Sequence, residues 1–371
     1  MADVEKFMSV DAGDIEKIMG VAVGDIETVM GLSIVTMQAY EGQTFLMTGG
    51  YMDVTRTKTN SIQKKSSTST GNADDFGDST DLITSQGSFG GGGRGIVAMG
   101  GNLGSSAADT NEISYVSFST DGNAADTNDN SAHTHEGSCG AGNGVKGGRA
   151  GGYSTSIGYP NGYMEDMDRY VIAGGSDASD IGTLQYTTGY DVYNASTSTT
   201  WIMAGGFSPQ TTNSYADDIH YMTWASEGNS TDSSNLTARR THGRSTISNE
   251  SVVIFAPSTS RVGDSSSTEY RLAQMDYVTP ASLGDGASDY GDDVGDDGLA
   301  PGDTDAITRS PGGGVADGTR GEWWGGAPVS ANAGNYADSI RYVGLASLGD
   351  SVDAGNDGKG GREGHAGCAG T

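Results

Sequence analysis

Residues 113–126, which read ISYVSFSTDGNAAD, contain the pattern that decides the fold. The aliphatic Ile113 is followed two places on by the aromatic Tyr115 and nine places on by the dipeptide Gly122-Asn123. Alternate side chains of a strand share one face, and Gly-Asn readily adopts positive φ, so the pattern predicts a strand that ends in a tight reversal. The strand pairs recur as Ile62/Lys64, Ile113/Tyr115, Leu184/Tyr186, Ile219/Tyr221, Met275/Tyr277 and Ile340/Tyr342, with turns at Gly71-Asn72, Gly122-Asn123, Tyr193-Asn194, Gly228-Asn229, Gly284-Asp285 and Gly349-Asp350. The chain is therefore predicted to be a repeat protein.

A second pattern lies upstream of these strands, where a hydrophobic stretch runs into paired glycines. The pairs are Gly49-Gly50, Gly100-Gly101, Gly174-Gly175, Gly205-Gly206 and Gly325-Gly326. One more copy, at residues 252–257 and fifth in chain order, keeps the hydrophobic stretch and lacks the glycines. Paired glycines after a buried strand predict a place where neighbouring backbones come too close for a side chain.

A third element, led by arginine, precedes the better copies of the glycine pattern. It spans Arg239 to Ser248 and Arg309 to Asp317, with a shorter version near Arg149. It returns as Arg362 to Cys368, with no glycine-pair strand after it, whereas the first glycine-pair strand has no such element before it. The two ends are therefore predicted to complete one unit together.

These three elements resemble the kelch family of β-propellers, whose units open on an Arg-led strand and continue through a Gly-Gly strand to a strand marked by Tyr. Kelch units run near 50 residues, and residues 43–371 divided by six give about 55. The resemblance implies an all-β, six-bladed propeller over residues 36–371, closed by pairing of the C-terminal strand into the first blade. Such closure removes the open sheet edge. The uneven spacing around Leu184 leaves five or seven blades open, and a parallel β-solenoid is the alternative fold.

The unit Ile113 to Asp126, and Ile62 to Asp75 with Lys64 in place of Tyr, also resemble repeats of virion structural proteins of marine tailed phages, cyanophages especially. That resemblance implies a location in the virion, after assembly in the host cytoplasm, and a non-enzymatic role. Two roles stay open: a tail-fibre or receptor-binding propeller that attaches to a host surface glycan or protein, and a capsid decoration or tail or baseplate component. A propeller glycosidase is a further alternative. No cofactor is expected.

Residues 1–35 form a separate segment with a period of 11 residues. Asp14 and Asp25 stand where helix N-caps would, and Gly20 and Gly31 where C-caps would, so short helices are predicted. Helices this short are unstable alone and need a partner surface. We interpret the segment as an anchor to other virion proteins or to sister chains in a homo-oligomer, through Ile15, Ile18, Met19, Ile26, Val29 and Met30.

Composition agrees with many short strands joined by turns, since 61 of 371 residues are glycine, although a disordered chain would look similar. The formal net charge of −28 argues against nucleic-acid binding, which requires clustered Lys and Arg. No apolar run approaches the length of a membrane helix, and the first residues lack the features of a secretory signal, so neither membrane insertion nor an export leader is expected. Cys139 and Cys368 are expected to be unpaired.

The sequence contains only weak signals for a metal-binding or ligand-binding site. The acidic clusters at 74–78, 121–129 and 292–297 offer oxygen ligands to calcium but do not follow the spaced calcium loop, so we interpret them as turn residues. His133, His135 and Cys139 lack a second ligand pair nearby in sequence, so no metal site is predicted there. Packing between blades explains Trp201 and Trp323, while the spacing of Trp224 indicates an outward-facing side chain. Binding is expected in the long segments 128–168 and 284–308.

Deleting residues 1–35 is expected to abolish incorporation of the protein into particles, because the deletion removes the predicted anchor. Quantitative immunoblotting of purified particles would measure this. Incorporation of the truncated protein at the normal copy number would refute the anchoring role.

Overall fold

The computed structural model divides the chain into two compact units, Met1–Gln38 and Ala39–Thr371. In the first unit it describes residues 17–18, 21–22, 28–29 and 32–33. In the second it describes residues 44–370 except 53–56, 85, 92, 104–108, 135–136, 138–139, 155–161, 175, 186–190, 209–213, 242–244, 262–268, 294–312, 327–336, 357–361 and 364–365.

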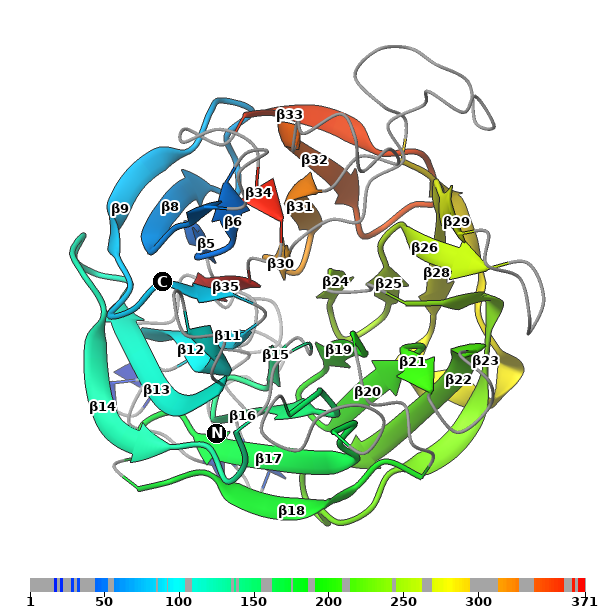
Figure 1. Ribbon diagram of the computed structural model, residues 1–371, viewed down its shortest axis with the longest axis horizontal. Helices are drawn as coiled ribbons and strands as arrows, with labels where there is room; N and C mark the ends of the chain where they lie inside the picture. The colour runs from blue at the N-terminus through cyan, green and yellow to red at the C-terminus, as the bar shows by residue number, and fades with distance from the viewer. Residues whose placement is uncertain are drawn as a thin grey trace, which may run out of the picture. The chain divides into compact units, whose positions relative to one another are not determined.

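The second unit is a six-bladed β-propeller in which six antiparallel sheets surround a common axis (Figure 1). Each blade has four strands, named here from the axis outward. Blade 1 is β35 (Ala366–Gly370), β5 (Thr44–Thr48), β8 (Ser61–Ser66) and β9 (Asp74–Asp78). Blade 2 is β11 (Gly87–Gly91), β12 (Arg94–Leu103), β13 (Asp109–Ser117) and β14 (Ala125–Asn130). Blade 3 is β15 (Gly140–Gly142), β16 (Lys146–Ala150), β17 (Asp166–Val171) and β18 (Ser179–Thr183).

The second half of the ring repeats this arrangement. Blade 4 is β19 (Tyr193–Ser196), β20 (Thr200–Ala204), β22 (Ser214–Thr223) and β23 (Thr231–Arg240). Blade 5 is β24 (Thr246–Ser248), β25 (Val253–Phe255), β28 (Gln274–Val278) and β29 (Ser288–Asp292). Blade 6 is β30 (Gly313–Ala316), β31 (Arg320–Gly326), β32 (Ala337–Gly344) and β33 (Val352–Asn356). The predicted six-bladed fold is therefore confirmed.

The two ends of the ring meet in blade 1, as predicted. Strand β35 pairs with β5 over its whole length, from Ala366 opposite Thr48 to Gly370 opposite Thr44. The C-terminal strand thus occupies the innermost position of a blade whose other three strands come from the start of the unit. This pairing covers the inner edge of β5 and joins the part of the chain that follows blade 6 to blade 1.

The innermost strands are made largely of small residues. Strand β15 reads GAG, β30 reads GGVA and β35 reads AGCAG. A Cβ atom added to Gly140 would lie 2.5 Å from both the backbone nitrogen and the carbonyl oxygen of Ser88 in the neighbouring blade. Because six inner strands lie close to the axis, a side chain would not fit at such positions. Glycine is therefore required here as well as at the glycine pairs.

The glycine pairs lie at the end of the second strand in every blade except blade 5, where Ala256-Pro257 follows β25. Gly49 and Gly50 have φ of 70° and 99°, and Gly325 and Gly326 have φ of 59° and 130°, values that disfavour any residue with a Cβ. Gly205, Gly206 and Gly100 also have positive φ. The pairs therefore serve backbone conformation, and the close approach predicted from the sequence occurs as well, since a Cβ at Gly100 or Gly205 would lie 3.0 Å from the carbonyl oxygen of Thr110 or Arg240.

The assignment of blade 3 from the sequence was wrong. Its glycine pair is Gly151-Gly152, with φ of 68° and 122°, whereas Gly174-Gly175 follows the third strand. Its aliphatic marker is Met167, because Leu184 comes after the outer strand. Blade 3 escaped recognition because its second strand, KGGRA, has no large apolar residue and Met167 is followed two places on by Arg169 in place of Tyr. Tyr186 lies outside the described residues.

The Gly-Asn turns join neighbouring blades as well as reversing the chain. Asn123 of blade 2 accepts, through Oδ1, a 3.0 Å hydrogen bond from the amide of Asp78 in blade 1, and the Ala124 amide donates to the Asp78 carbonyl at 2.7 Å. Equivalent side-chain bonds are Asn229 with Thr183, Asp350 with Asp292 and Asn72 with Asn356. We call these four contacts the inter-blade clasps. At the fifth blade, Gly284-Asp285 instead lies in the 3-10 helix η3 (Pro280–Asp285).

Two further expectations are corrected by the strand assignments. The predicted binding segment 128–168 contains β15 and β16, the two inner strands of blade 3, and the segment 284–308 contains β29. The described parts of residues 1–35 form two antiparallel pairs, β1 (Lys17–Ile18) with β2 (Val21–Ala22) and β3 (Thr28–Val29) with β4 (Leu32–Ser33), and not helices. Each pair is joined by Met-Gly, and a glycine there suits a two-residue hairpin connection as well as a helix C-cap. Ile15, Met19, Ile26 and Met30 lie outside the described residues.

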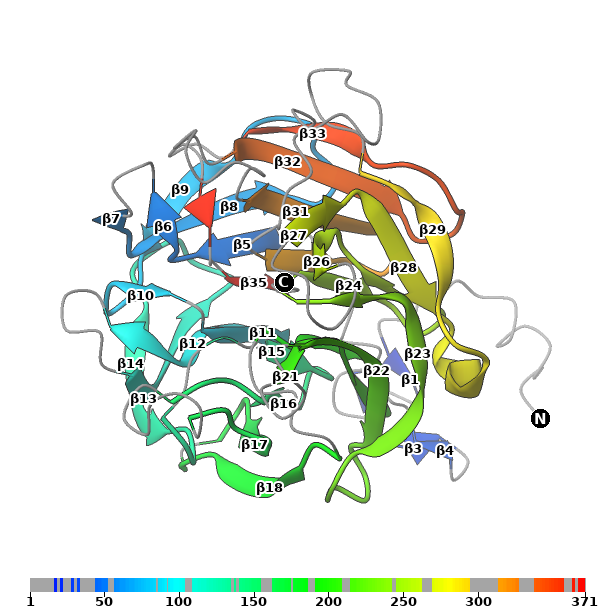
Figure 2. The same ribbon diagram turned by 45° about the vertical axis from the view of Figure 1, so that its right-hand side comes forward.

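Short extra strands extend several blades on one side of the ring. They are β6 (Tyr51–Met52), β7 (Thr57–Lys58), β10 (Ile83–Thr84), β21 (Phe207–Ser208), β26 (Ser258–Arg261), β27 (Glu269–Leu272) and β34 (Arg362–Glu363). We call this side, where second strands lead into third strands and outer strands cross to the next blade, the crossover face; Figure 2 shows β6 and β7 beside β5. The opposite side is the turn face. Among the described residues, no helix has the length and apolar character to span a bilayer.

Replacing Gly77 by alanine is expected to destabilise the propeller by about 1–3 kcal/mol, because the new Cβ would lie 2.3 Å from the Gly122 carbonyl oxygen across an inter-blade clasp. The matched control is Gly122→Ala on the other side of the same clasp, where an added Cβ meets nothing within 4 Å. Urea denaturation of both variants measures the difference. Equal stability of the two would contradict the role of the clasp.

Candidate functional site

One buried polar position recurs in all six blades. It follows the aliphatic residue of the third strand, and its occupants are Gln63, Ser114, Asp168, His220, Asp276 and Arg341, all 5% exposed or less. This position does not show as a repeated residue type in the sequence, because its six occupants share only their polarity. Burying a polar group costs free energy unless a partner compensates it, and the residue to be compensated differs from blade to blade.

An aspartate of the outer strand lies opposite this position in every blade. The six are Asp75, Asp126, Asp180, Asp232, Asp289 and Asp353. Asp180, Asp289 and Asp353 each accept a hydrogen bond of 3.0–3.1 Å from the amide two residues on, at the glycine of a β-bulge. This local bond gives the three aspartates a structural role, and Asp126 of the acidic cluster at 121–129 likewise accepts from the Asn128 amide at 2.8 Å.

Buried ion pairs link adjacent blades. Arg240 of blade 4 contacts Asp276 of blade 5 at 2.7 Å, and both side chains are fully buried. The sequence interpretation placed this structural arginine at Arg239, whose side chain is 45% exposed and 4.0 Å from Asp217. Arg149, also fully buried, donates to the carbonyl of Met99 in blade 2 at 2.6 Å. These charged groups therefore hold blades together.

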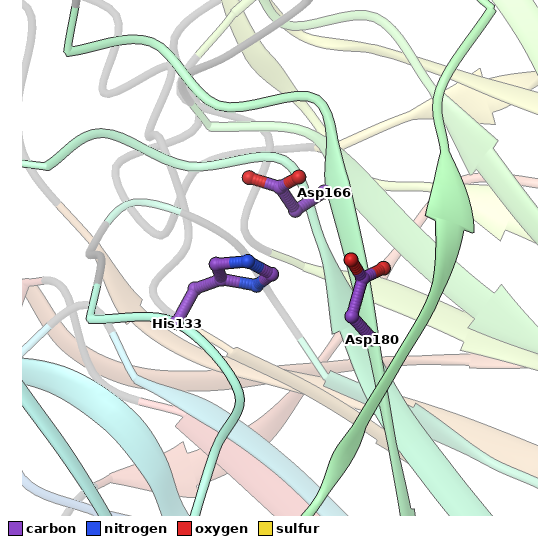
Figure 3. A group of neighbouring side chains, drawn as sticks. All are labelled: His133, Asp166 and Asp180. Carbon is purple, nitrogen blue, oxygen red and sulfur yellow. The ribbon is translucent and has the colours of Figure 1, made fainter.

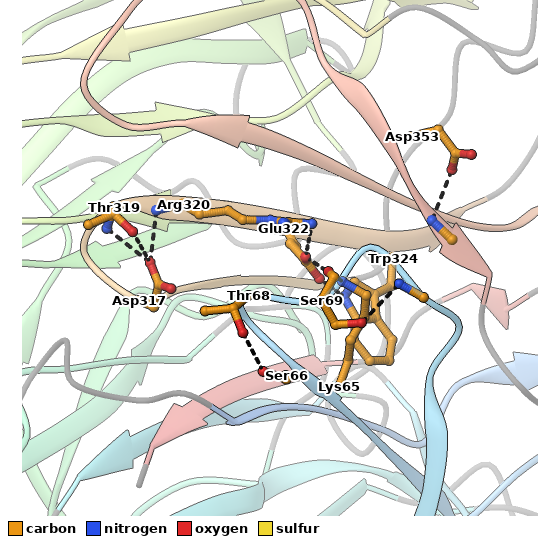
Figure 4. Close-up of polar contacts among 12 residues, drawn as sticks. Lys65, Ser66, Thr68, Ser69, Asp317, Thr319, Arg320, Glu322, Trp324 and Asp353 are labelled. Atoms are coloured by element: carbon orange, nitrogen blue, oxygen red, sulfur yellow. Dashed lines mark hydrogen bonds and ion pairs between the residues drawn. The ribbon is translucent and has the colours of Figure 1, made fainter.

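The largest of these networks joins blades 6 and 1 around Glu322 (Figure 4). Glu322 accepts hydrogen bonds from Lys65 at 2.6 Å and from the indole of Trp324 at 3.2 Å, and it forms an ion pair with Arg320 at 2.6 Å. Burial lowers the pKa of Lys65 and raises the pKa of Glu322, because both side chains are removed from water. Lys65 and Glu322 therefore stay charged in this buried position only because their partners compensate them.

The aromatic residues singled out in the sequence lie in the packing. Trp201, Trp323 and Trp324 are fully buried. Trp224 is 3% exposed, stacks on Trp201 at a ring distance of 5.0 Å and donates to Ser196, so the prediction that it faces outward was wrong. The repeat tyrosines Tyr115, Tyr221, Tyr277 and Tyr342 are half-buried. Arginine side chains lie over two of them, Arg94 over Tyr115 and Arg320 over Tyr342.

A row of other aromatic side chains crosses from blade 3 to blade 4 on the crossover face. Tyr153 contacts Tyr163 with ring centroids 5.1 Å apart, Tyr163 contacts Phe207 at 5.4 Å, and Phe207 contacts Tyr215 at 6.0 Å. The first three are half-buried, whereas Tyr215 is 4% exposed. We call these four residues the aromatic row. Tyr153, Tyr163 and Phe207 lie between second and third strands and Tyr215 lies at the start of β22, and no repeat pattern covers these positions.

A second group of functional interest lies at blade 3, where His133 is on the connection from β14 to β15. Its Nδ1 lies 2.8 Å from the buried carboxylate of Asp168, whose other oxygen accepts from the His133 amide at 3.2 Å. The hydrogen bond to Asp168 raises the pKa of His133. The sequence interpretation considered His133 only with His135 and Cys139, both outside the described residues.

The carboxylates of Asp166 and Asp180 lie beside the same imidazole (Figure 3). One potential ligand atom from each of His133, Asp166 and Asp180 lies within 4.8 Å of the other two. No other such group occurs among the described residues. Sequence proximity could not reveal it, because Asp166 and Asp180 are 33 and 47 residues after His133.

Comparisons with known proteins add no family. No protein-family model matches the chain. No curated protein matches its sequence. The kelch and phage resemblances therefore depend on the motifs alone.

Replacing Glu322 by glutamine is expected to destabilise the protein by about 3–5 kcal/mol, because it leaves Lys65 buried without a counter-charge. The matched control is Lys64→Gln on the same strand, which removes the exposed Lys64–Asp121 pair and should cost less than about 1 kcal/mol. Urea denaturation measures both. A loss below about 1 kcal/mol for Glu322→Gln would contradict the structural role of the network.

Proposed function

We propose that this protein is a non-enzymatic component of a phage virion that binds a host-surface glycan or protein through the crossover face of its propeller. Residues 1–35 serve as the anchor to other virion proteins or to sister chains. The single observation that carries the binding role is the difference between the two faces of the ring. The virion assignment is supported by the motif resemblance of the repeats.

The turn face offers short, capped hairpins between first and second strands. Asn143, Thr197, Asn249 and Asp317 each accept, through a side-chain oxygen, a hydrogen bond of 2.8–3.0 Å from the amide three residues on. Such side-chain caps hold a tight reversal in one conformation. These turns are regular from blade to blade, which suits a structural surface.

The crossover face is irregular by comparison. It carries β6, β7, β21, β26, β27 and β34 in addition to the four regular strands of each blade, and these insertions differ between blades. The aromatic row also lies here. Tyr side chains offer a flat apolar surface together with a hydroxyl, a combination suited to sugar rings and to protein surfaces. Binding residues on connections carried by a rigid scaffold are the usual arrangement.

The rest of the ring supports the scaffold role. The ring is closed by β35, clasped at Gly-Asn turns and linked by buried ion pairs such as Arg240–Asp276. Polar residues such as Asn123 and Asp276 are used in these contacts, which favours a structural protein over a hydrolase. Purely structural decoration of the capsid or tail is the alternative, and it differs in leaving the crossover face without a host ligand.

Purified, fluorescently labelled protein is expected to bind saturably to marine cyanobacterial cells. The double variant Tyr163→Ala/Phe207→Ala should bind at least about tenfold more weakly, since it removes the centre of the aromatic row. Val145→Ser is the control, because Val145 is 65% exposed on the turn face. Thermal melts establish that all three proteins are folded.

Immunogold labelling of particles and an adsorption assay complete the test. Label at fibre tips, together with inhibition of adsorption by the free protein, is the expected result. Label over the shell or tail body, with no inhibition, would overturn the attachment role in favour of decoration.

A further inference from the structure

We propose that His133, Asp166 and Asp180 bind a divalent transition-metal ion, with zinc the best chemical match, at the crossover face of blade 3. This inference goes beyond the proposed function and is independent of it. The three residues come from different elements: the β14–β15 connection, the start of β17 and the second position of β18. The fold therefore assembles a set of ligands that no local sequence contains.

The distances suit a small cation. Zinc binds imidazole nitrogen and carboxylate oxygen at about 2.0–2.2 Å, which places ligand atoms about 3.4 Å apart in a tetrahedral site. The three ligand atoms already lie within 4.8 Å of one another, a separation that binding of the ion would shorten to about 3.4 Å. Asp180 is exposed and Asp166 is half-buried, so an ion can reach the group from solvent.

Asp168 orients the imidazole as a metal ligand. It is fully buried and hydrogen-bonds His133 Nδ1 at 2.8 Å while also accepting the His133 amide. This leaves Nε2 as the ligand nitrogen. Figure 3 shows the carboxylates of Asp166 and Asp180 turned toward the ring. Metal-binding histidines commonly donate their second ring nitrogen to a carboxylate in this way, which fixes the tautomer and the ring direction.

The local charge also favours a cation. Asp166, Asp168 and Asp180 lie around His133, with Glu165 next in the chain. Three carboxylates therefore lie beside one imidazole, and Asp166 is half-buried. Arg149 lies opposite Asp168 in the sheet register but directs Nη1 to the Met99 carbonyl. A dication would compensate the carboxylates directly.

Blade 5 compensates its buried carboxylate in a different way at the equivalent positions. Asp276 and Asp289 correspond to Asp168 and Asp180, but Gln274 stands in place of Asp166. The permanent cation Arg240 contacts Asp276 at 2.7 Å there. In blade 5 a permanent cation of the protein thus compensates the buried carboxylate of Asp276, whereas blade 3 has a titratable histidine and one more carboxylate. The comparison indicates that blade 3 is built for an exchangeable cation.

The ligand set distinguishes among metals. Calcium and magnesium prefer oxygen ligands alone, whereas imidazole with carboxylates suits zinc and neighbouring transition metals. Three protein ligands leave a fourth position for water or for an oxygen atom of a bound molecule. The site is therefore expected to select zinc over calcium.

The test is isothermal titration of EDTA-treated full-length protein with ZnCl₂ and, separately, CaCl₂. We expect one equivalent of zinc to bind at neutral pH, no calcium binding at the same site, and a rise in Tm with zinc. Asp180→Asn should weaken zinc binding at least about tenfold, since the asparagine keeps the oxygen that accepts the Gly182 amide and loses the charged ligand. Asp289→Asn, the equivalent change in blade 5, should bind zinc as the parent protein does.

Two further measurements keep the test decisive. His133→Asn retains a donor for Asp168 and removes Nε2, so it should lose zinc binding while keeping the metal-free Tm within a few degrees of the parent. The cobalt-substituted protein should show no thiolate charge-transfer band. Unchanged zinc affinity in Asp180→Asn, equal loss in Asp289→Asn, or a thiolate band that assigns the metal to cysteine would each overturn the proposal.

Discussion

The pairing of β35 with β5 is the contact on which the rest of the molecule depends. It places the last strand of the chain at the innermost edge of the first blade, so the backbone groups of that edge are satisfied and the ring is closed. Closure holds six inner strands close to one axis, which explains why strands such as GAG and AGCAG contain almost no side-chain volume. The apolar core consequently lies between the blades, in clusters built from second and third strands, as with Leu46, Ile62 and Val97 of blades 1 and 2.

Packing between blades also buries polar side chains. Each third strand buries one polar side chain beside its aliphatic residue, and Gln63, Asp276 and Arg341 contact partners from the same or an adjacent blade. Arg240 with Asp276 is one such contact, and Lys65 with Glu322 is a further buried pair between blades. Because a buried charge without a partner is costly, these pairs make the order of the blades specific even where their shapes are similar. Blade 3 uses His133 and Asp168 for the same purpose, and that choice creates the candidate metal site.

Much of the architecture could be predicted from the repeats, and the failures have identifiable causes. Five third strands were recognised because an aliphatic residue, a residue two places on and a turn recur at fixed spacing. Blade 3 was misassigned because Met167 is followed by Asp168 and Arg169, which break that pattern, although its spacing from Ile113 and Ile219 is regular. The N-terminal segment was assigned to helices because an acidic residue before a short apolar run and a glycine after it suit a helix and a hairpin equally.

The sequence by itself determined that the chain is built from repeated units, the strand periodicity within them and the joining of the two chain ends, because each depends on local side-chain alternation or on a recurring short motif. Only the tertiary structure decided what the polar residues do. Asn123 reaches the neighbouring blade, Lys65 meets Glu322, and His133 meets Asp166 and Asp180, and each contact joins residues separated by dozens to hundreds of positions. Such contacts arise from the rotation of one blade against the next around a closed axis, a geometry that no local stretch of the chain encodes.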